Sequence, residues 1–351
     1  MTQKSTMFAC EASIITQGIV NNLLPVMLVI FKDDFGISYS SLANLLLLNF
    51  AVQLCTDWFS IRIINKLGYR NSGILAQISA GLGLIFIGTL TRIMPVYAGL
   101  IISVLFTAFG GGMLEVMVSP IVENLTYGSS SSRMSMLHSF YCWGHVGVVL
   151  ISTLFFFLFG IENWKVLACI WALVPFLNTF YFGIVPIFPI VAEHEKLSLK
   201  SLLGQKVFWL LVVLMVCAGA SEQAMSQWAS AFAESGLNVS KTVGDLAGPC
   251  AFAVFMGTAR ALYGKYSDKI PLMKMMIGSA VLCVGCYLLT SLSGNPAVSL
   301  IGCAICGFSV GIFWPGTFSL AAKKLPGGGT AMYALMALAG DLGCSSGPTV
   351  V

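Results

Sequence analysis

Charged side chains are scarce in this sequence: only 9% of its 351 residues are Asp, Glu, Lys or Arg, whereas 57% are hydrophobic. A water-soluble domain carries about 25% charged residues, so this composition excludes a soluble globular protein. The mean hydropathy is +0.89, and the sequence therefore predicts an all-α polytopic membrane protein. The net charge of +4 does not indicate nucleic-acid binding, because in a membrane protein the placement of the basic residues matters more than their sum.

Motifs for nucleotide chemistry are also missing. No GxxxxGK[ST] loop occurs, and the Gly-rich stretches GGG and PGGG are not followed by Lys and Ser or Thr. We find no pairing of a nucleophile with a base at a water-accessible face, so we expect neither an enzyme nor a cofactor. The first apolar segment has no small-residue cleavage site and is followed by many more such segments, so we expect no removable signal peptide.

Eleven apolar stretches are long enough to cross a bilayer, which takes about 20 residues. They cover residues 8–31, 41–64, 73–93, 97–125, 135–160, 164–188, 206–231, 244–264, 274–293, 297–321 and 329–351. The last stretch ends at the chain terminus, which indicates that a twelfth helix is missing from this sequence.

The basic residues predict the orientation of these spans. With a cytoplasmic N-terminus, fourteen Lys and Arg lie in cytoplasmic segments and four lie outside, as the positive-inside rule favours. We therefore expect a multi-pass protein of the plasma (inner) membrane whose N-terminus is cytoplasmic.

Two predicted cytoplasmic loops, six spans apart, are alike. The first reads NKLGYR at 65–70, and the second reads GKYSDKIPLMK at 264–274. Each places an amide or carboxylate beside a Lys, followed by a turn-forming residue and a further basic residue. This pattern predicts a parallel repeat of two bundles, with residues 1–188 as a six-helix bundle, 189–205 as a cytoplasmic linker, and 206–351 as a second bundle of five spans.

These loops resemble the signature G-x-x-x-[DN]-[RK]-x-G-x-[RK] of the major facilitator superfamily, although Ile61 replaces the leading Gly and Pro271 interrupts the second copy. The matching residues are Asn65, Lys66, Gly68 and Arg70 in the first loop, and Gly264, Asp268, Lys269 and Lys274 in the second. The resemblance implies a transporter of two six-helix bundles. It also implies that the loops, with the cytoplasmic-side charges Asp57 and Arg260, make contacts that stabilise the outward-open state. The alternative is that these charges only set the topology.

The fourth predicted span carries a closer resemblance. GMLEVMVSPIV at 112–122 is similar to the G-x-L-E/Q-x-x-x-N-P segment of the fucose–galactose–hexose proton symporter branch, with Ser119 in place of Asn. WPGTFSLA, from Trp314 onward, is similar to that branch's FPTIFSLA. Asn21 stands where the branch carries an acid. The resemblance implies a sugar as substrate and Glu115 as the acidic residue of its site.

Glu115 is the main candidate for proton and substrate binding. An ionisable residue at a helix centre costs about 2.5–3.5 kcal/mol on insertion scales, so such residues usually face the interior of a bundle. Gly111, Glu115, Ser119 and Glu123 follow one another at a spacing of four and form a small, polar row. Because burial disfavours the charged form of a lone carboxylate, Glu115 is predicted to exchange a proton. The alternative is a glutamate that only hydrogen-bonds a neighbouring span. Glu123, at the cytoplasmic end, is predicted to act in gating.

Other polar or aromatic side chains inside the spans are further candidates for substrate or proton binding. They are Ser119, Asn21, Asn22, Glu222, Gln223, Gln227, Trp314, Asp341, His138 and His145. Carboxylates and amides bind hydroxyl groups, and aromatic rings pack against organic ligands. The spacing of seven places the two histidines on one helix face. Each candidate has a structural alternative: a solvated outer mouth for the Glu222 group, a partner for another donor for Asp341, and a hydrogen-bonded helix end for the histidines.

Two cysteine pairs have the spacing of a zinc site. Cys283 and Cys286, then Cys303 and Cys306, form a C-x2-C…C-x2-C pattern. We nevertheless expect packing and no metal, because four thiolates inside a membrane would need a closed site and an entry path. Cysteine is also common elsewhere in the chain, which contains 11 of them.

The expected function is secondary transport of a small solute, with sugar as the first candidate, driven by protons through Glu115. The expected partners are the solute, the proton and the lipid bilayer, without nucleic acid, and the protein is expected to be monomeric. Two alternatives stay open: an uncoupled facilitator or an exporter of drugs or metabolites, and a receptor that binds without transporting.

Overall fold

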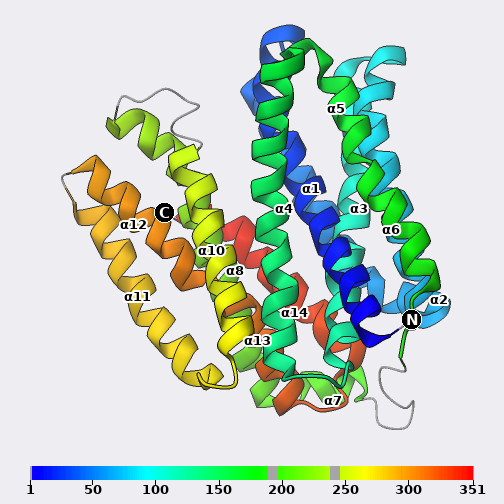
Figure 1. The fold of residues 1–351 in the computed structure, drawn as a ribbon, viewed down its shortest axis with the longest axis vertical. Helices are drawn as coiled ribbons and strands as arrows, with labels where there is room; N and C mark the ends of the chain where they lie inside the picture. The colour runs from blue at the N-terminus through cyan, green and yellow to red at the C-terminus, as the bar shows by residue number, and fades with distance from the viewer. Residues whose placement is uncertain (1, 189–196, 238–245, 294, 351) are drawn as a thin grey trace. The chain divides into compact units, whose positions relative to one another are not determined.

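The computed structural model describes residues 2–188, 197–237, 246–293 and 295–350. These residues form helices joined by short turns, with no strand among them (Figure 1). In chain order the helices are α1 (Gln3–Phe35), α2 (Tyr39–Ile93), α3 (Val96–Glu123), α4 (Ser130–Phe159), η1 (Ile161–Asn163), α5 (Trp164–Trp171), α6 (Leu173–Ile184), α7 (Leu199–Leu203), α8 (Lys206–Leu237), η3 (Leu246–Cys250), α10 (Ala251–Tyr266), α11 (Leu272–Leu292), α12 (Pro296–Val310), α13 (Phe313–Lys324) and α14 (Gly329–Val350).

The predicted all-helical class is confirmed. Within the described residues, seven helical stretches are long and apolar enough to cross a membrane, judged by length and composition. One of these stretches is the 55-residue α2, which covers two of the predicted spans. The predicted number of eleven spans therefore stays a prediction.

Helix α2 is divided by a single glycine. Gly68 has φ 76° and ψ 165°, a conformation that is not helical and that side chains with a Cβ avoid. The residues on either side continue as two helical arms, 39–67 and 69–93. The sequence predicts a loop at 65–70, whereas the structure keeps these residues helical except at Gly68.

The predicted tenth span also differs from the structure. It is built as two helices, α12 and α13, with a turn at Gly311 and Ile312 between them. The predicted eighth span begins with the π-helical turn η3, which contains Pro249, before α10 continues. Pro249 has no backbone N–H, so it cannot donate a helical hydrogen bond at this position.

The chain divides into two compact units. The first contains residues 1–121 and 144–189, and the second contains 122–143 and 190–351. Thus α4 contributes its first half to the second unit, whereas the predicted bundle 1–188 assigns all of it to the first. The bundle boundaries remain a prediction.

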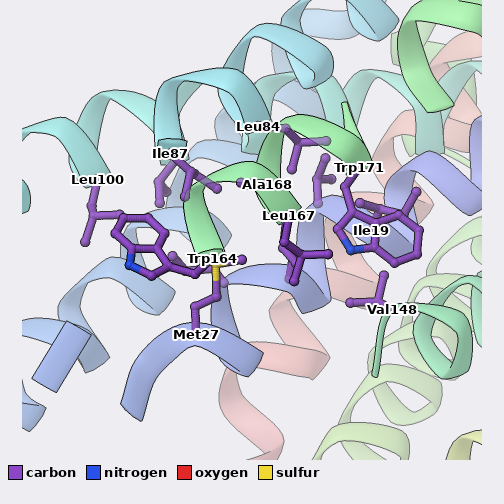
Figure 2. Close-up of a cluster of buried hydrophobic side chains, with 14 of the residues drawn as sticks. Ile19, Met27, Leu84, Ile87, Leu100, Val148, Trp164, Leu167, Ala168 and Trp171 are labelled. Atoms are coloured by element: carbon purple, nitrogen blue, oxygen red, sulfur yellow. The ribbon is translucent and has the colours of Figure 1, made fainter. Parts of the chain in front are cut away.

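The apolar core of the first unit is centred on α5 (Figure 2). Trp164 is 2% exposed and meets Phe31 of α1 edge-on, with ring centroids 5.2 Å apart. Two turns further along the same face of α5, Trp171 donates its indole N–H to the Ser152 hydroxyl at 3.2 Å. The hydrogen bond satisfies the polar atom of a ring that is otherwise buried among apolar side chains.

The second unit has two apolar clusters. One gathers Met225, Phe252 and Met256 with five cysteines, from α4, α8, α10, α11 and α12. The other packs Tyr263 of α10 against Met276 of α11 and Ile312. Both clusters hold α10 between the α11–α12 hairpin and its neighbours, which positions the polar residues of α10 described below.

Two phenylalanines of α6 test this packing as a matched pair. Phe182 is 0% exposed and Phe180 is 76% exposed. Removing a buried phenyl group leaves a cavity of roughly 100 Å³, which costs about 2 kcal/mol at about 24 cal/mol per Å³. We therefore expect Phe182→Ala to lower the thermal unfolding midpoint of the purified protein by several degrees, measured by tryptophan fluorescence. Phe180→Ala should leave it unchanged, and equal shifts for both variants would contradict the observed packing of α6.

Candidate functional site

Three polar side chains follow one another along α1 at a spacing of four residues. Ser13 and Gln17 are buried, at 0% and 5% exposure, and Asn21 is half-buried. Because residues four apart share one face of a helix, they form a continuous stripe, which we call the α1 polar row. Each member of the row has a hydrogen-bond partner on a different part of the first unit.

Gln17 meets the main candidate residue. Its side-chain amide N–H donates to the carboxylate of Glu115 on α3, and Glu115 is 6% exposed. Gly111, one turn before Glu115, faces Gln17 and Asn21, so α1 and α3 approach closely here. An amide carries both a donor and an acceptor. By rotating, Gln17 can therefore pair with either the charged or the protonated form of Glu115.

Asn21 extends the row toward the first arm of α2. Its side-chain oxygen accepts from the Gln53 amide at 2.9 Å, and Gln53 is 1% exposed. Asn22 instead donates to the backbone oxygen of Gly18 at 2.8 Å, within its own helix. Ser119, one turn after Glu115 on α3, is fully buried.

Ser13 extends the row in the other direction. Its hydroxyl accepts from Gln77 at 2.9 Å and from Asn178 at 3.0 Å, and it donates to the Ala9 carbonyl at 2.8 Å. The side-chain oxygens of Gln77 and Asn178 are buried and have no hydrogen-bond donor among the described residues. Two amide oxygens are thus available to accept from a hydroxyl group.

The amides of this cluster are not among the residues that the sequence singles out. These residues are uncharged: Gln17, Gln53, Gln77 and Asn178. The cost of burial, which singles out ionisable groups inside spans, is therefore no signal for them. The signal for Gln17 is its place midway between Ser13 and Asn21 on one face of α1.

The second unit contains a buried ion pair. The Arg260 guanidinium on α10 donates to the Glu222 carboxylate on α8 at 3.1 Å. Arg260 is 3% exposed and Glu222 is 8% exposed. The guanidinium also donates to the Gly311 carbonyl at 2.8 Å and to the His138 carbonyl at 3.1 Å, and its fourth partner is the Cys142 sulfur at 3.3 Å.

This ion pair bears on two predicted placements. The sequence places Arg260 among the charges at the cytoplasmic side and Glu222 in the outer half of its span. In the structure the two side chains meet inside one unit, so the two placements cannot both hold. Asp57 is buried, at 0% exposure, and its place at the cytoplasmic side stays a prediction. The sequence assigns a charged residue to one side of the membrane only from its distance to a predicted span end. This distance is a poor guide for residues one or two turns inside a span.

Several aromatic rings gather near the ion pair in the second unit. His138 is stacked on Phe318, with centroids 5.8 Å apart and an interplanar angle of 26°. Phe318 also contacts Trp314 edge-on at 6.2 Å and Tyr333 at 5.3 Å. The Trp314 ring lies directly against Gly340, beside the buried Asp341. Trp314, His138 and Asp341 therefore belong to one neighbourhood.

The remaining candidates do not join these clusters. His145 is half-buried and belongs to the first unit, whereas His138 belongs to the second. Gln223 is half-buried beside Glu222 on α8. The side chain of Gln227 lies outside the described part of the chain.

The first signature loop is held by its arginine. Arg70 donates to the backbone carbonyls of Phe182 at 3.4 Å, Gly183, and Val185 at 2.8 Å. These carbonyls lie at the C-terminal end of α6, where backbone oxygens have no hydrogen-bond donor within the helix. The helix dipole also favours a cation at this end. Asn65, Lys66 and Gly68 are exposed. A gating role for this loop stays a prediction.

The second signature loop lies against the start of α4. Gly264 accepts through its carbonyl from the Ser132 hydroxyl, and Ser267 exchanges a hydrogen bond with Ser129 at 3.0 Å. Asp268 and Lys269 are exposed. Close by in sequence, Glu123 accepts from the Ser130 hydroxyl at 2.6 Å. It joins the end of α3 to the start of α4, and its gating role stays a prediction.

Arg133 is a structural residue that the sequence marks only as a positive charge. It is 6% exposed, and its guanidinium donates to four backbone carbonyls of the turn between α3 and α4. They belong to Val122 at 3.1 Å, Glu123 at 3.1 Å, Gly128 at 2.9 Å, and Tyr127. This one side chain thus fixes the turn between the two helices.

A family comparison agrees with this architecture. The sequence profile of the Major Facilitator Superfamily matches residues 12–348, which is nearly the whole chain. No curated protein sequence matches the chain.

Solved structures with the same fold cover almost the full length. The E. coli fucose:proton symporter FucP has a TM-score of 0.78 at 14% identity, covering 100% of this chain and 92% of its own. The proton:xylose symporter XylE has a TM-score of 0.82 at 13% identity, covering 99% and 88%. The human organic anion transporter MFSD10 (TETRAN) has a TM-score of 0.76 at 16% identity, covering 100% and 93%. At these identities the likeness shows the fold alone.

The buried ion pair makes a prediction about stability. Removing one partner of a buried pair leaves an uncompensated charge and costs about 3–5 kcal/mol. We expect Arg260→Met to lower the unfolding midpoint strongly, whereas the double variant Arg260→Met with Glu222→Gln recovers most of the loss. A double-mutant cycle on the purified protein measures this coupling. Simple additivity of the two substitutions would show that the pair is not coupled.

Proposed function

The chain belongs to the Major Facilitator Superfamily, and from this premise we propose that it carries a small hydroxylated solute, with sugar as the first candidate, together with protons. Members of the family are secondary transporters, so the protein is a transporter and not an enzyme. We further propose a cytoplasmic N-terminus, a place in the plasma (inner) membrane, and two bundles, 1–188 and 206–351, that rock about a central site.

The observation that carries the proton coupling is the contact between Glu115 and Gln17. Glu222 contacts a guanidinium, and protonating it would leave the Arg260 charge without its counterion. Glu115 accepts from the neutral amide of Gln17, a partner that can pair with either the charged or the protonated carboxyl group. We therefore assign the coupling proton to Glu115 and a static role to Glu222.

The α1 polar row supports a hydroxylated solute. The row combines the amides of Gln17 and Asn21 with the Ser13 hydroxyl, and the Ser119 hydroxyl on α3 is buried one turn from Glu115. These donors and acceptors match those of sugar hydroxyls. The ring cluster around Trp314 offers flat apolar faces of the kind that line small-molecule sites. FucP and XylE are proton symporters of fucose and xylose, and those two sugars are therefore the first to test.

A solute screen tests the substrate class. We expect a monosaccharide to raise the thermal unfolding midpoint of the purified protein, and to do so more at acidic than at neutral pH. The pH difference follows because a protonated Glu115 gives the site a further hydroxyl donor. Stabilisation by organic anions without any sugar response would instead favour the exporter alternative.

A second experiment tests the role of Glu115 with its neutral isostere. In proteoliposomes, Glu115→Gln should abolish accumulation driven by a pH gradient, by at least about tenfold, because the site can no longer release a proton. It should retain exchange of labelled solute for unlabelled solute, since Gln keeps the hydrogen bond to Gln17. Ser103→Ala, another α3 position that is buried, serves as the control and should accumulate normally.

Three outcomes separate the alternatives. Gradient-driven accumulation that persists in Glu115→Gln would contradict coupling through Glu115. Equilibration without accumulation in the wild-type protein would identify a facilitator, and solute binding without any flux would identify a receptor.

A further inference from the structure

The antiparallel hairpin of α11 and α12 (Figure 1) is held in one register at its turn. The Ser299 hydroxyl donates to the Thr290 carbonyl at 3.1 Å, and the Thr290 hydroxyl donates to the Ser299 carbonyl at 3.4 Å. Gly302 lies tight against α11, because a Cβ built there would come within 2.7 Å of the Thr290 hydroxyl oxygen. Thr290 and Ser299 therefore face each other, with the two helices in close contact.

This register brings the four hairpin cysteines together in two pairs. Cys286 lies four residues before Thr290, and Cys303 lies four residues after Ser299. A further step of three residues along each helix reaches Cys283 and Cys306. Equal steps away from a facing pair in an antiparallel hairpin lead to facing residues, so Cys286 is opposite Cys303 and Cys283 is opposite Cys306. Cys283 and Cys306 also belong to one buried cluster.

The surroundings of these thiols are apolar. Cys283 is 7% exposed, Cys286 4%, Cys303 2% and Cys306 0%, and the same cluster contains Met225, Phe252 and Met256. Within the described part of the chain, no three His, Cys, Asp or Glu side chains are placed to hold a metal ion. Two thiolates on a monovalent metal would carry a net charge into this cluster, which is costly. A disulfide is neutral and suits the same surroundings.

We propose that Cys283 and Cys306 form a reversible disulfide that ties α11 to α12, with a peroxide as the oxidant. The facing register at Thr290 and Ser299 and the shared buried cluster supply the geometry. The bond would close a loop within the hairpin and restrict sliding of α11 along α12, whose chain continues directly into the helix that carries Trp314.

The chemistry balances with one peroxide for each disulfide. The Cys283 sulfur acts, as its thiolate, as the attacking nucleophile. It attacks one peroxide oxygen, the O–O bond breaks, and the thiol proton leaves with the second oxygen as water. The resulting Cys283 sulfenic acid condenses with the Cys306 thiol, the S–S bond forms, and a second water leaves. Two thiols are oxidised by two electrons, and hydrogen peroxide is reduced to two molecules of water.

Peptide mapping of the whole purified chain tests the proposal. The protein is treated with hydrogen peroxide, its remaining thiols are alkylated, and the digest is analysed by mass spectrometry with and without dithiothreitol. We expect a Cys283–Cys306 cross-linked peptide that dithiothreitol releases, together with a rise of the unfolding midpoint in the oxidised protein. Cys283→Ser and Cys306→Ser should each remove the cross-link and the rise. Cys217→Ser, at an exposed free cysteine, should keep both.

Other results would overturn the proposal, and they require only the wild-type protein. Cross-linking of Cys286 to Cys303 alone would show that the wrong pair has been assigned. Oxidation of Cys283 to a sulfinic acid without any cross-link would show that Cys306 cannot reach it. Oxidation confined to the exposed cysteines Cys55 and Cys217 would show that the oxidant does not enter the hairpin.

Discussion

A carboxyl group at position 115 is compatible with an apolar helix only if another group hydrogen-bonds to it, and the amide of Gln17 does so. An unsatisfied buried acceptor costs several kilocalories per mole in an apolar environment, on the order of 2–7. This requirement fixes which face of α1 turns toward α3. When Gln17 pairs with Glu115, the spacing of four residues places Asn21 and Ser13 on the same face of α1. Asn21 then pairs with Gln53, and Ser13 pairs with Gln77 and Asn178. The polar row thus aligns α2, α3 and α6 around one helix.

The two units accommodate a buried carboxylate by different means. In the first unit a neutral amide contacts Glu115, and in the second a guanidinium contacts Glu222. Arg260 is itself held by backbone carbonyls of α4 and of the turn between α12 and α13. A site that changes its charge during a cycle needs a partner that tolerates both forms, which an amide does. The ion pair suits a constant arrangement, and this contrast is the physical basis for assigning the moving proton to Glu115.

Much of the fold follows from hydropathy, because apolar stretches of about 20 residues are unambiguous. Their division is harder to predict. The break in α2 depends on the positive φ of one glycine. The turn between α12 and α13, at Gly311 and Ile312, contains no polar residue that would mark it in the sequence. Glu115 and Glu222 were identifiable because charge is rare inside spans. Gln17 and Gln53 are not, because a neutral amide inside a span carries no charge whose burial cost would single it out. The contact between Arg260 and Glu222 is hard to predict for a related reason, because its two helices are far apart in the sequence.

The central claim, that Glu115 changes its protonation when solute binds, is tested most directly by infrared difference spectroscopy. The carboxylic acid C=O stretch reports a protonated carboxyl group without any need for transport. The account predicts a solute-induced change of this band in the wild-type protein that disappears in Glu115→Gln and persists in the α3 control Ser103→Ala. An unchanged band on solute binding, or a change that survives in Glu115→Gln, would contradict the account.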